Sequence, residues 1–164
     1  MTTATFDRAQ LLAARGSVAE AMEAVDALLA AEPDHVQALL LKAGLLLDAR
    51  SGDEALALFD RAAAAAPRSA EALNGVATCL HALGRDDEAL AAAQKARALL
   101  DEGDNFRFAA PVYLTIVWCL REQRRFREAL DAADEGLGRS PDAILAQWAS
   151  LVEEELAEAE KEEC

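Results

Sequence analysis

Apolar residues recur along this chain at the three- and four-residue spacing of helices, and Gly, Pro and short polar segments separate the apolar blocks. β-branched residues are sparse, and no segment alternates with the two-residue period of a strand. The pattern therefore predicts an all-α chain. The helices are expected at about 4–15, 18–31, 34–49, 53–65, 69–83, 86–101, 108–123, 126–138 and 142–161.

Residues 111–120, "PVYLTIVWCL", fit the helical pattern least well. They are apolar on all sides and include four β-branched residues. Because the block has the length of its neighbours, we expect a deeply packed helix there.

A short motif, Glu-Ala followed by Leu or Met, occurs four times. Its alanines are Ala21, Ala55, Ala89 and Ala129, separated by 34, 34 and 40 residues. Each interval holds two predicted helices, and an amphipathic pair cannot bury its apolar face alone. Stacked pairs bury one continuous core, so the interval indicates a helical solenoid. The motif alanine must be small because the second helix crosses the first at close range there.

Other positions keep the same register. Ala9, Ala43 and Ala77 each lie twelve residues before a motif alanine, and Val117 takes that place in the last unit. Twelve residues after the motif alanine, Pro33, Pro67 and Pro141 are expected to end the second helix. The third unit has Asp101 instead, and there the period is six residues longer. We expect Asp101–Phe106 to form a longer helix end or a protruding loop.

These residues resemble the tetratricopeptide repeat, W-x-x-L-G-x-x-Y followed by A-x-x-x-F and P. The second unit reads Leu39, Lys42, Ala43 and Leu46, then Ala55, Phe59 and Pro67; the third reads Leu73, Val76, Ala77 and Leu80, then Ala89 and Ala93. The first reads Thr5, Arg8, Ala9, Leu12, Ala21, Val25 and Pro33, and the fourth Tyr113, Ile116, Val117, Leu120, Ala129, Ala133 and Pro141. Arg8 and Lys42 replace the family's Leu, and their long stems can lie along apolar surface.

The resemblance implies one domain over residues 1–164, a right-handed α-solenoid of about four helix pairs at about 2–35, 36–69, 70–103 and 110–143. Residues 142–161 then form a capping helix. Its apolar stripe comprises Ile144, Leu145, Trp148, Leu151, Val152 and Leu156, and its other face is acidic.

In this family the first helices line a concave groove that binds ligands. By register, the groove residues are Phe6, Gln10, Ala13, Gln37, Leu40, Gly44, Leu47, Asn74, Thr78, His81, Leu114, Trp118 and Arg121. Trp118 is either the main binding anchor or a residue packed on the capping helix. His81 is either a ligand contact or simply a polar residue of the groove.

Charge narrows the range of partners. Thirty acidic against sixteen basic residues give a formal charge of −14, with seven Glu and one Lys in residues 153–163. Such a chain repels phosphate backbones, so we expect no nucleic-acid partner. The surplus either attracts a basic partner or only keeps the surface soluble.

No apolar run approaches the roughly 18 residues of a membrane span. The N-terminal residues also lack a signal-peptide pattern. We therefore expect no membrane association and a cytoplasmic location.

Candidate chemistry is sparse. Cys79 and Cys119 occupy equivalent repeat positions and are expected to be buried structural thiols; Cys164 is the third cysteine. His35, beside a helix start, is expected at the surface. No phosphate loop, nucleophile motif or metal-spaced His/Cys set is present, so no enzyme, cofactor or metal is expected.

The sequence therefore favours a non-enzymatic interaction module, or adaptor, that binds a peptide or protein segment in the groove. Asn74 suits a family mode in which Lys and Asn clamp a C-terminal carboxylate, but the lysines are absent. The alternatives are a self-assembling scaffold subunit, which would make a homo-oligomer, and a small chaperone of bacterial secretion systems.

Overall fold

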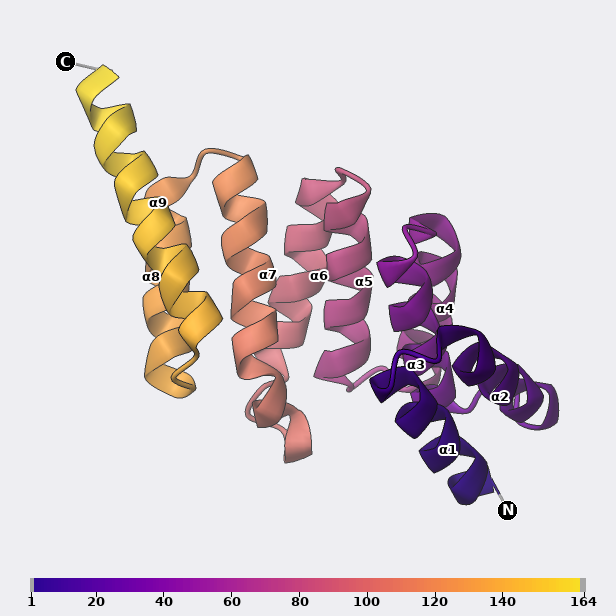
Figure 1. Ribbon diagram of the computed structural model, residues 1–164. Helices are drawn as coiled ribbons and strands as arrows, with labels where there is room; N and C mark the ends of the chain where they lie inside the picture. Colours follow the sequence, from indigo (N-terminus) through magenta and orange to yellow (C-terminus); the bar gives the residue numbers. More distant parts are fainter. Residues whose placement is uncertain (1, 163–164) are drawn as a thin grey trace. The chain divides into compact units, whose positions relative to one another are not determined.

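The computed structural model describes residues 2–162, which contain nine α-helices, one 3-10 helix and no strand (Figure 1). The elements are α1 (Thr2–Ala14), α2 (Val18–Ala31), α3 (Val36–Asp48), α4 (Gly52–Ala65), α5 (Ala70–Ala82), α6 (Asp86–Ala98), η1 (Gly103–Phe108), α7 (Ala109–Glu122), α8 (Phe126–Arg139) and α9 (Ala143–Glu162). Each expected helix is present with its ends within a few residues, so the all-α prediction is confirmed, including the helix over residues 111–120.

The chain divides into two compact units, Met1–Arg68 and Ser69–Cys164. In the first unit α1 packs on α2, α3 packs on α4, and α2 contacts α3. Its core includes Ala9, Val25, Leu28 and Ala38, which are buried together. At residue 42 the family pattern has Leu, but this chain has Lys. The Lys42 ammonium forms an ion pair with Asp26 Oδ1 on α2, at 2.5 Å.

In the second unit the pairs are α5 with α6 and α7 with α8, and α7 also packs against α5 and α6. Helix α9 contacts both α7 and α8. First helices thus neighbour first helices, which is the contact pattern of stacked helical hairpins.

Small residues mark every helix crossing that the repeat register predicted. All of them are fully buried: Ala9, Ala21, Ala43, Ala55, Ala77, Ala89, Val117 and Ala129 have 0% exposure. A larger side chain at these positions would force the paired backbones apart. The explanation of the motif by close helix packing is therefore confirmed.

The turns within the four pairs share one backbone conformation. Gly16, Arg50, Gly84 and Arg124 have φ values of 78°, 63°, 73° and 57°, the left-handed region. The next residue donates its N–H back to the helix that ends, as Arg85 N does to Leu80 O at 2.9 Å. This is the usual glycine-type helix ending, and two of its four positions are arginine.

The six-residue insertion forms neither a longer helix end nor a protruding loop. It is the 3-10 helix η1, which contacts α5 and α7. Asn105 holds it in place, since Asn105 Oδ1 accepts from Ala70 N at 3.1 Å and its Nδ2 donates to Leu99 O at 3.2 Å. The insertion therefore caps the N-terminus of α5.

Helix α9 buries a narrower stripe than the sequence predicted. Leu145 and Val152 are fully buried against the repeats, and Trp148 is half-buried. Ile144 and Leu151 keep 54% and 37% exposure. The helix begins with an Asp142 cap, whose Oδ1 accepts from Leu145 N at 2.9 Å.

A close approach of α7, α8 and α9 occurs at Gly136. A Cβ atom there would lie 2.7 Å from Tyr113 Cβ and 2.7 Å from Leu145 Cδ2. Tyr113 is fully buried, and its hydroxyl donates to Glu135 Oε1 at 2.5 Å. Burial, followed by this hydrogen bond, raises the pKa of Tyr113 to about 12.

None of the helices in the described part of the chain is long and apolar enough to cross a membrane. Cys79 and Cys119 are buried, as expected, whereas Cys164 lies outside the described residues.

Candidate functional site

In the second unit, the first helices α5 and α7 carry six of the residues expected to bind a partner, and the capping helix α9 packs beside α7. We call the surface formed by these helices the α5–α7–α9 face. The six residues are Asn74, Thr78, His81, Leu114, Trp118 and Arg121, each of them half-buried. The repeat register places them on neighbouring helices, and α5 contacts α7 while α7 contacts α9.

Three aromatic rings form a continuous cluster on this face. The His81 ring stacks on Trp118 with centroids 5.8 Å apart, and Trp118 meets Trp148 of α9 edge-on at 5.8 Å. Trp118 thus packs against the capping helix, one of the two roles considered for it. It also lines an open pocket of about 210 Å³ with His81, Arg121, Glu122 and Trp148.

Arg121 closes one side of that pocket through a forked ion pair. Its Nε lies 2.8 Å from Glu155 Oε2, its Nη1 lies 2.9 Å from Glu122 Oε1, and its guanidinium lies 5.6 Å from the Trp148 ring centroid. Hydrogen bonding to Glu155 raises the pKa of Arg121 above its usual range. Arg121 therefore positions Trp148 and the Glu155 carboxylate on α9. The positive charge of Arg121 is largely paired with Glu155 and Glu122.

Two polar atoms beneath the face are buried without a hydrogen-bond partner in the described structure, Asn74 Oδ1 and Trp118 Nε1. Thr78 is engaged instead, donating to Asn74 O at 2.9 Å and lying 3.4 Å from the Thr115 hydroxyl. An unpaired buried donor or acceptor costs about 1–3 kcal/mol.

The first unit carries the other expected residues on α1 and α3. Gln10 and Gln37 are exposed, and Phe6, Gly44 and Leu47 are half-buried. Leu40 is only 7% exposed, so it packs inside the unit and offers little surface to a partner. A Cβ atom at Gly44 would meet nothing within 4 Å, so the surface of α3 is open there.

His35 departs from the expected surface position. It is half-buried at the start of α3, where its Nδ1 accepts from Ala38 N at 3.2 Å, and its ring lies 5.6 Å from Phe6. A helix cap and a ring contact account for its burial.

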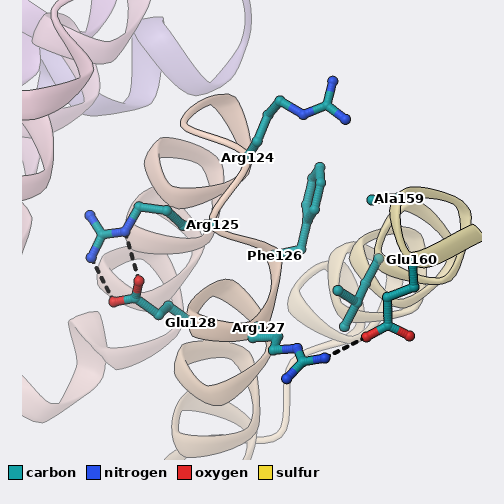
Figure 2. A pocket seen from close by; sticks show the side chains of 8 residues that line it. Arg124, Arg125, Phe126, Arg127, Glu128, Ala159 and Glu160 are labelled. Carbon is teal, nitrogen blue, oxygen red and sulfur yellow. Dashed lines mark hydrogen bonds and ion pairs between the residues drawn. The ribbon is translucent and has the colours of Figure 1, made fainter. Parts of the chain in front are cut away.

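A second pocket, of about 470 Å³, lies at the turn between α7 and α8 beside α9 (Figure 2). Its lining includes Arg124–Glu128, Leu156, Ala159 and Glu160. Arg125 pairs with Glu128 and Arg127 with Glu160, each at 2.6 Å, while the Arg124 guanidinium lies 5.9 Å from the Phe126 ring centroid. The repeat register did not predict a site in this region. Its one signal was the "RRFR" run, residues 124–127, in an otherwise acidic chain.

The fold and these faces define a helical-repeat protein of the α-solenoid class. The tetratricopeptide repeat model matches residues 6–70 and 45–105, more than half of the chain, so the chain belongs to the tetratricopeptide repeat family. Members of this family are in general protein-interaction modules, and this chain is one by class.

Several solved structures share this fold. A MamA protein is 21% identical over 93% of this chain and 81% of its own, with a TM-score of 0.74. PilF of Pseudomonas aeruginosa is 16% identical over 96% and 69%, with a TM-score of 0.82. YrrB, described as a tetratricopeptide repeat protein with an unusual peptide-binding site, is 20% identical over 90% and 74%, with a TM-score of 0.67. No curated protein matches the sequence.

Proposed function

We propose that this protein is a non-enzymatic adaptor that binds a peptide or protein segment on its first-helix faces. The pocket of the α5–α7–α9 face is the main anchoring site. The aromatic cluster of His81, Trp118 and Trp148 carries this proposal, because aromatic side chains in a pocket dominate the energetics of most peptide interfaces. We place the protein in the cytoplasm, which fractionation of native cells would test.

The lining of the pocket favours a particular partner chemistry. Two indole rings offer apolar contact, and the exposed Glu122 adds a negative charge at the rim. A segment with an aromatic or aliphatic anchor beside a Lys or Arg fits this combination. The family resemblance and the peptide-binding site described for YrrB support a peptide ligand.

The test uses the two tryptophans of the chain, both of which line this pocket. Peptides without Trp are selected from a random library on the immobilised protein, and their binding is followed by tryptophan emission. Occupation of the pocket should change that emission. Trp118→Ala and Trp148→Ala should each weaken binding at least about tenfold, equivalent to about 1.4 kcal/mol.

Ile144→Ala serves as the control, since Ile144 is exposed on the same helix as Trp148 but lies outside the pocket lining. Circular dichroism first confirms that every variant folds. Selected peptides that bind the two tryptophan variants as tightly as the native protein would refute the anchoring site.

A separate pair of variants tests the face of the first unit. Gly44→Phe should obstruct a ligand that lies along α3, whereas Gly44→Ala fits the open space there. Equal affinity of both variants for every selected peptide would remove α3 from the binding surface.

A second candidate function, self-assembly, rests on exposed apolar residues near both ends of the chain. Leu11 and Val18 are 51% and 45% exposed in the first unit, and Ile144 and Leu151 are exposed on α9. These pairs could join copies of the chain head to tail. Light scattering over a concentration series should then show growth that Ile144→Glu abolishes. A mass that stays monomeric throughout removes this candidate.

A further inference from the structure

Beside the aromatic cluster, three side chains with metal-binding atoms converge from three helices of the second unit. They are His81 near the end of α5, Asp86 at the start of α6 and Cys119 in α7. One ligand atom from each lies within 4.8 Å of the others, and His81 Nδ1 is 2.6 Å from Asp86 Oδ1.

The cluster is closed on one side and open on the other. Cys119 is fully buried, whereas the side chains of His81 and Asp86 are 25% and 24% exposed. An ion could therefore reach the thiol past the imidazole and the carboxylate.

We propose that His81, Asp86 and Cys119 form a zinc site with three protein ligands and one position open to water. Imidazole nitrogen, thiolate and carboxylate oxygen are the three ligand types that zinc takes in proteins. Ca²⁺ and Mg²⁺ prefer sites made of oxygen atoms alone, so this set selects a transition metal of the zinc class.

The geometry requires side-chain movements of up to about 1.5 Å, since ligand atoms as much as 4.8 Å apart must come to tetrahedral spacing. Bond lengths of about 2.0–2.3 Å in a tetrahedron place neighbouring ligand atoms about 3.3–3.6 Å apart. The contact between His81 and Asp86 would open from 2.6 Å by less than about 1 Å, which side-chain rotation supplies. The ends of α5 and α6 stay fixed, because a turn with Gly84 in the left-handed conformation joins them.

Charge and protons also balance at this site. Burial, and secondarily the Asp86 carboxylate, raise the pKa of the Cys119 thiol to about 12, so it is protonated without a metal. Zn²⁺ binding forms the Zn–S bond and releases that proton to solvent. The thiolate and the Asp86 carboxylate then offset both charges of the ion.

The set occurs once among the repeats. The first two units have other residues at these positions. Ala13 and Leu47 stand where the third unit has His81, and Val18 and Gly52 stand where it has Asp86. The equivalent of Cys119 is Cys79. Cys79 thus provides a matched buried thiol as a control.

The test is a titration of the metal-free, untagged protein with Co²⁺, which takes zinc geometry and is coloured. All variants carry Cys164→Ser, so that Cys79 and Cys119 are the only thiols. Native and Cys79→Ser proteins should show a thiolate-to-cobalt charge-transfer band and the strong visible absorption of tetrahedral cobalt. Cys119→Ser should lose the charge-transfer band, and His81→Gln and Asp86→Asn should weaken binding at least tenfold.

Binding of either ion to the metal-free protein should release one proton per site, and Zn²⁺ should then displace the cobalt without further proton release. Zn²⁺ should also raise the melting temperature of the Cys79→Ser protein but not that of Cys119→Ser, which controls for variants that fold poorly. Absence of the charge-transfer band in the native protein, or its persistence in Cys119→Ser, would overturn the site. Neither readout involves a peptide, so the outcome is independent of the adaptor proposal.

Discussion

At residue 136 only a hydrogen atom fits between α8 and its neighbours. The Cβ of Gly136→Ala would overlap Tyr113 and Leu145 at 2.7 Å, so we expect a loss of about 1–3 kcal/mol in the free energy of unfolding. Gly138→Ala is the matched control on the same helix, since nothing lies within 4 Å of its Cβ, and it should gain about 0.5–1 kcal/mol. Urea unfolding measures both. Equal stability of the two variants would contradict the described contact.

Tyr113 gives the protein a defined response to alkaline pH. Because its folded pKa is raised from 10.0 to about 12, its stabilising effect is complete below pH 10 and is lost as the pH rises through about 12. A shift of this size corresponds to no more than about 3 kcal/mol. The native protein should therefore lose more stability than Tyr113→Phe between pH 10 and pH 12 in thermal unfolding. If the native protein and Tyr113→Phe lose stability equally over this range, the Tyr113 phenol does not titrate as described.

Among its described residues, helix α9 is attached through only two buried side chains, Leu145 and Val152. Leu145 is fully buried, and Leu145→Ala should cost about 2–5 kcal/mol. Ile144→Ala, next to it but 54% exposed, should change stability by no more than about 0.5 kcal/mol. Chemical denaturation of the two variants is the measurement. Similar midpoints would mean that α9 does not dock through Leu145.

The sequence predicted the elements well because each depends on local rules. Apolar periodicity placed the helices, and small residues such as Ala55 and Ala89 identified the crossings that are fully buried. It did not predict η1, since the role of Asn105 as a cap for α5 depends on folding back over 35 residues. The sequence also did not predict the exposure of Ile144, because an apolar stripe on one helix does not show how much of it the neighbouring helices cover.

At the scale of the whole molecule, the site was only partly predictable. Register placed His81, Trp118 and Arg121 on neighbouring first helices. Trp148 and Glu155 join them from α9. They lie 34 residues after Leu114 and Arg121, one repeat period, but the sequence predicts a cap there and not a continuation of the groove. The convergence of Asp86 and Cys119 on His81 was missed because their separations match no metal-binding motif.

Whole-molecule charge should affect how fast a partner arrives more than how tightly it is held. Residues 158–164 carry four Glu and one Lys, and Arg127 pairs with Glu160 there at 2.6 Å on the surface. Removing them should slow association with a basic peptide and reduce its salt dependence, while affinity at high salt stays unchanged. Stopped-flow binding at several ionic strengths tests this. If the truncated protein no longer binds at any salt concentration, the tail itself is the recognition element.

The insertion between the third and fourth repeats has a consequence for protein engineering. A designer who idealises this chain to a uniform 34-residue period would delete six residues around Asn105. That deletion removes the acceptor for Ala70 N and the donor to Leu99 O together, so two partly buried helix ends lose these hydrogen-bond partners. Consensus design improves most repeat arrays, but here it should lower the melting temperature. Asn105→Ala in the full-length chain should reproduce most of that decrease, and an unchanged melting temperature would show that the insertion is only a spacer.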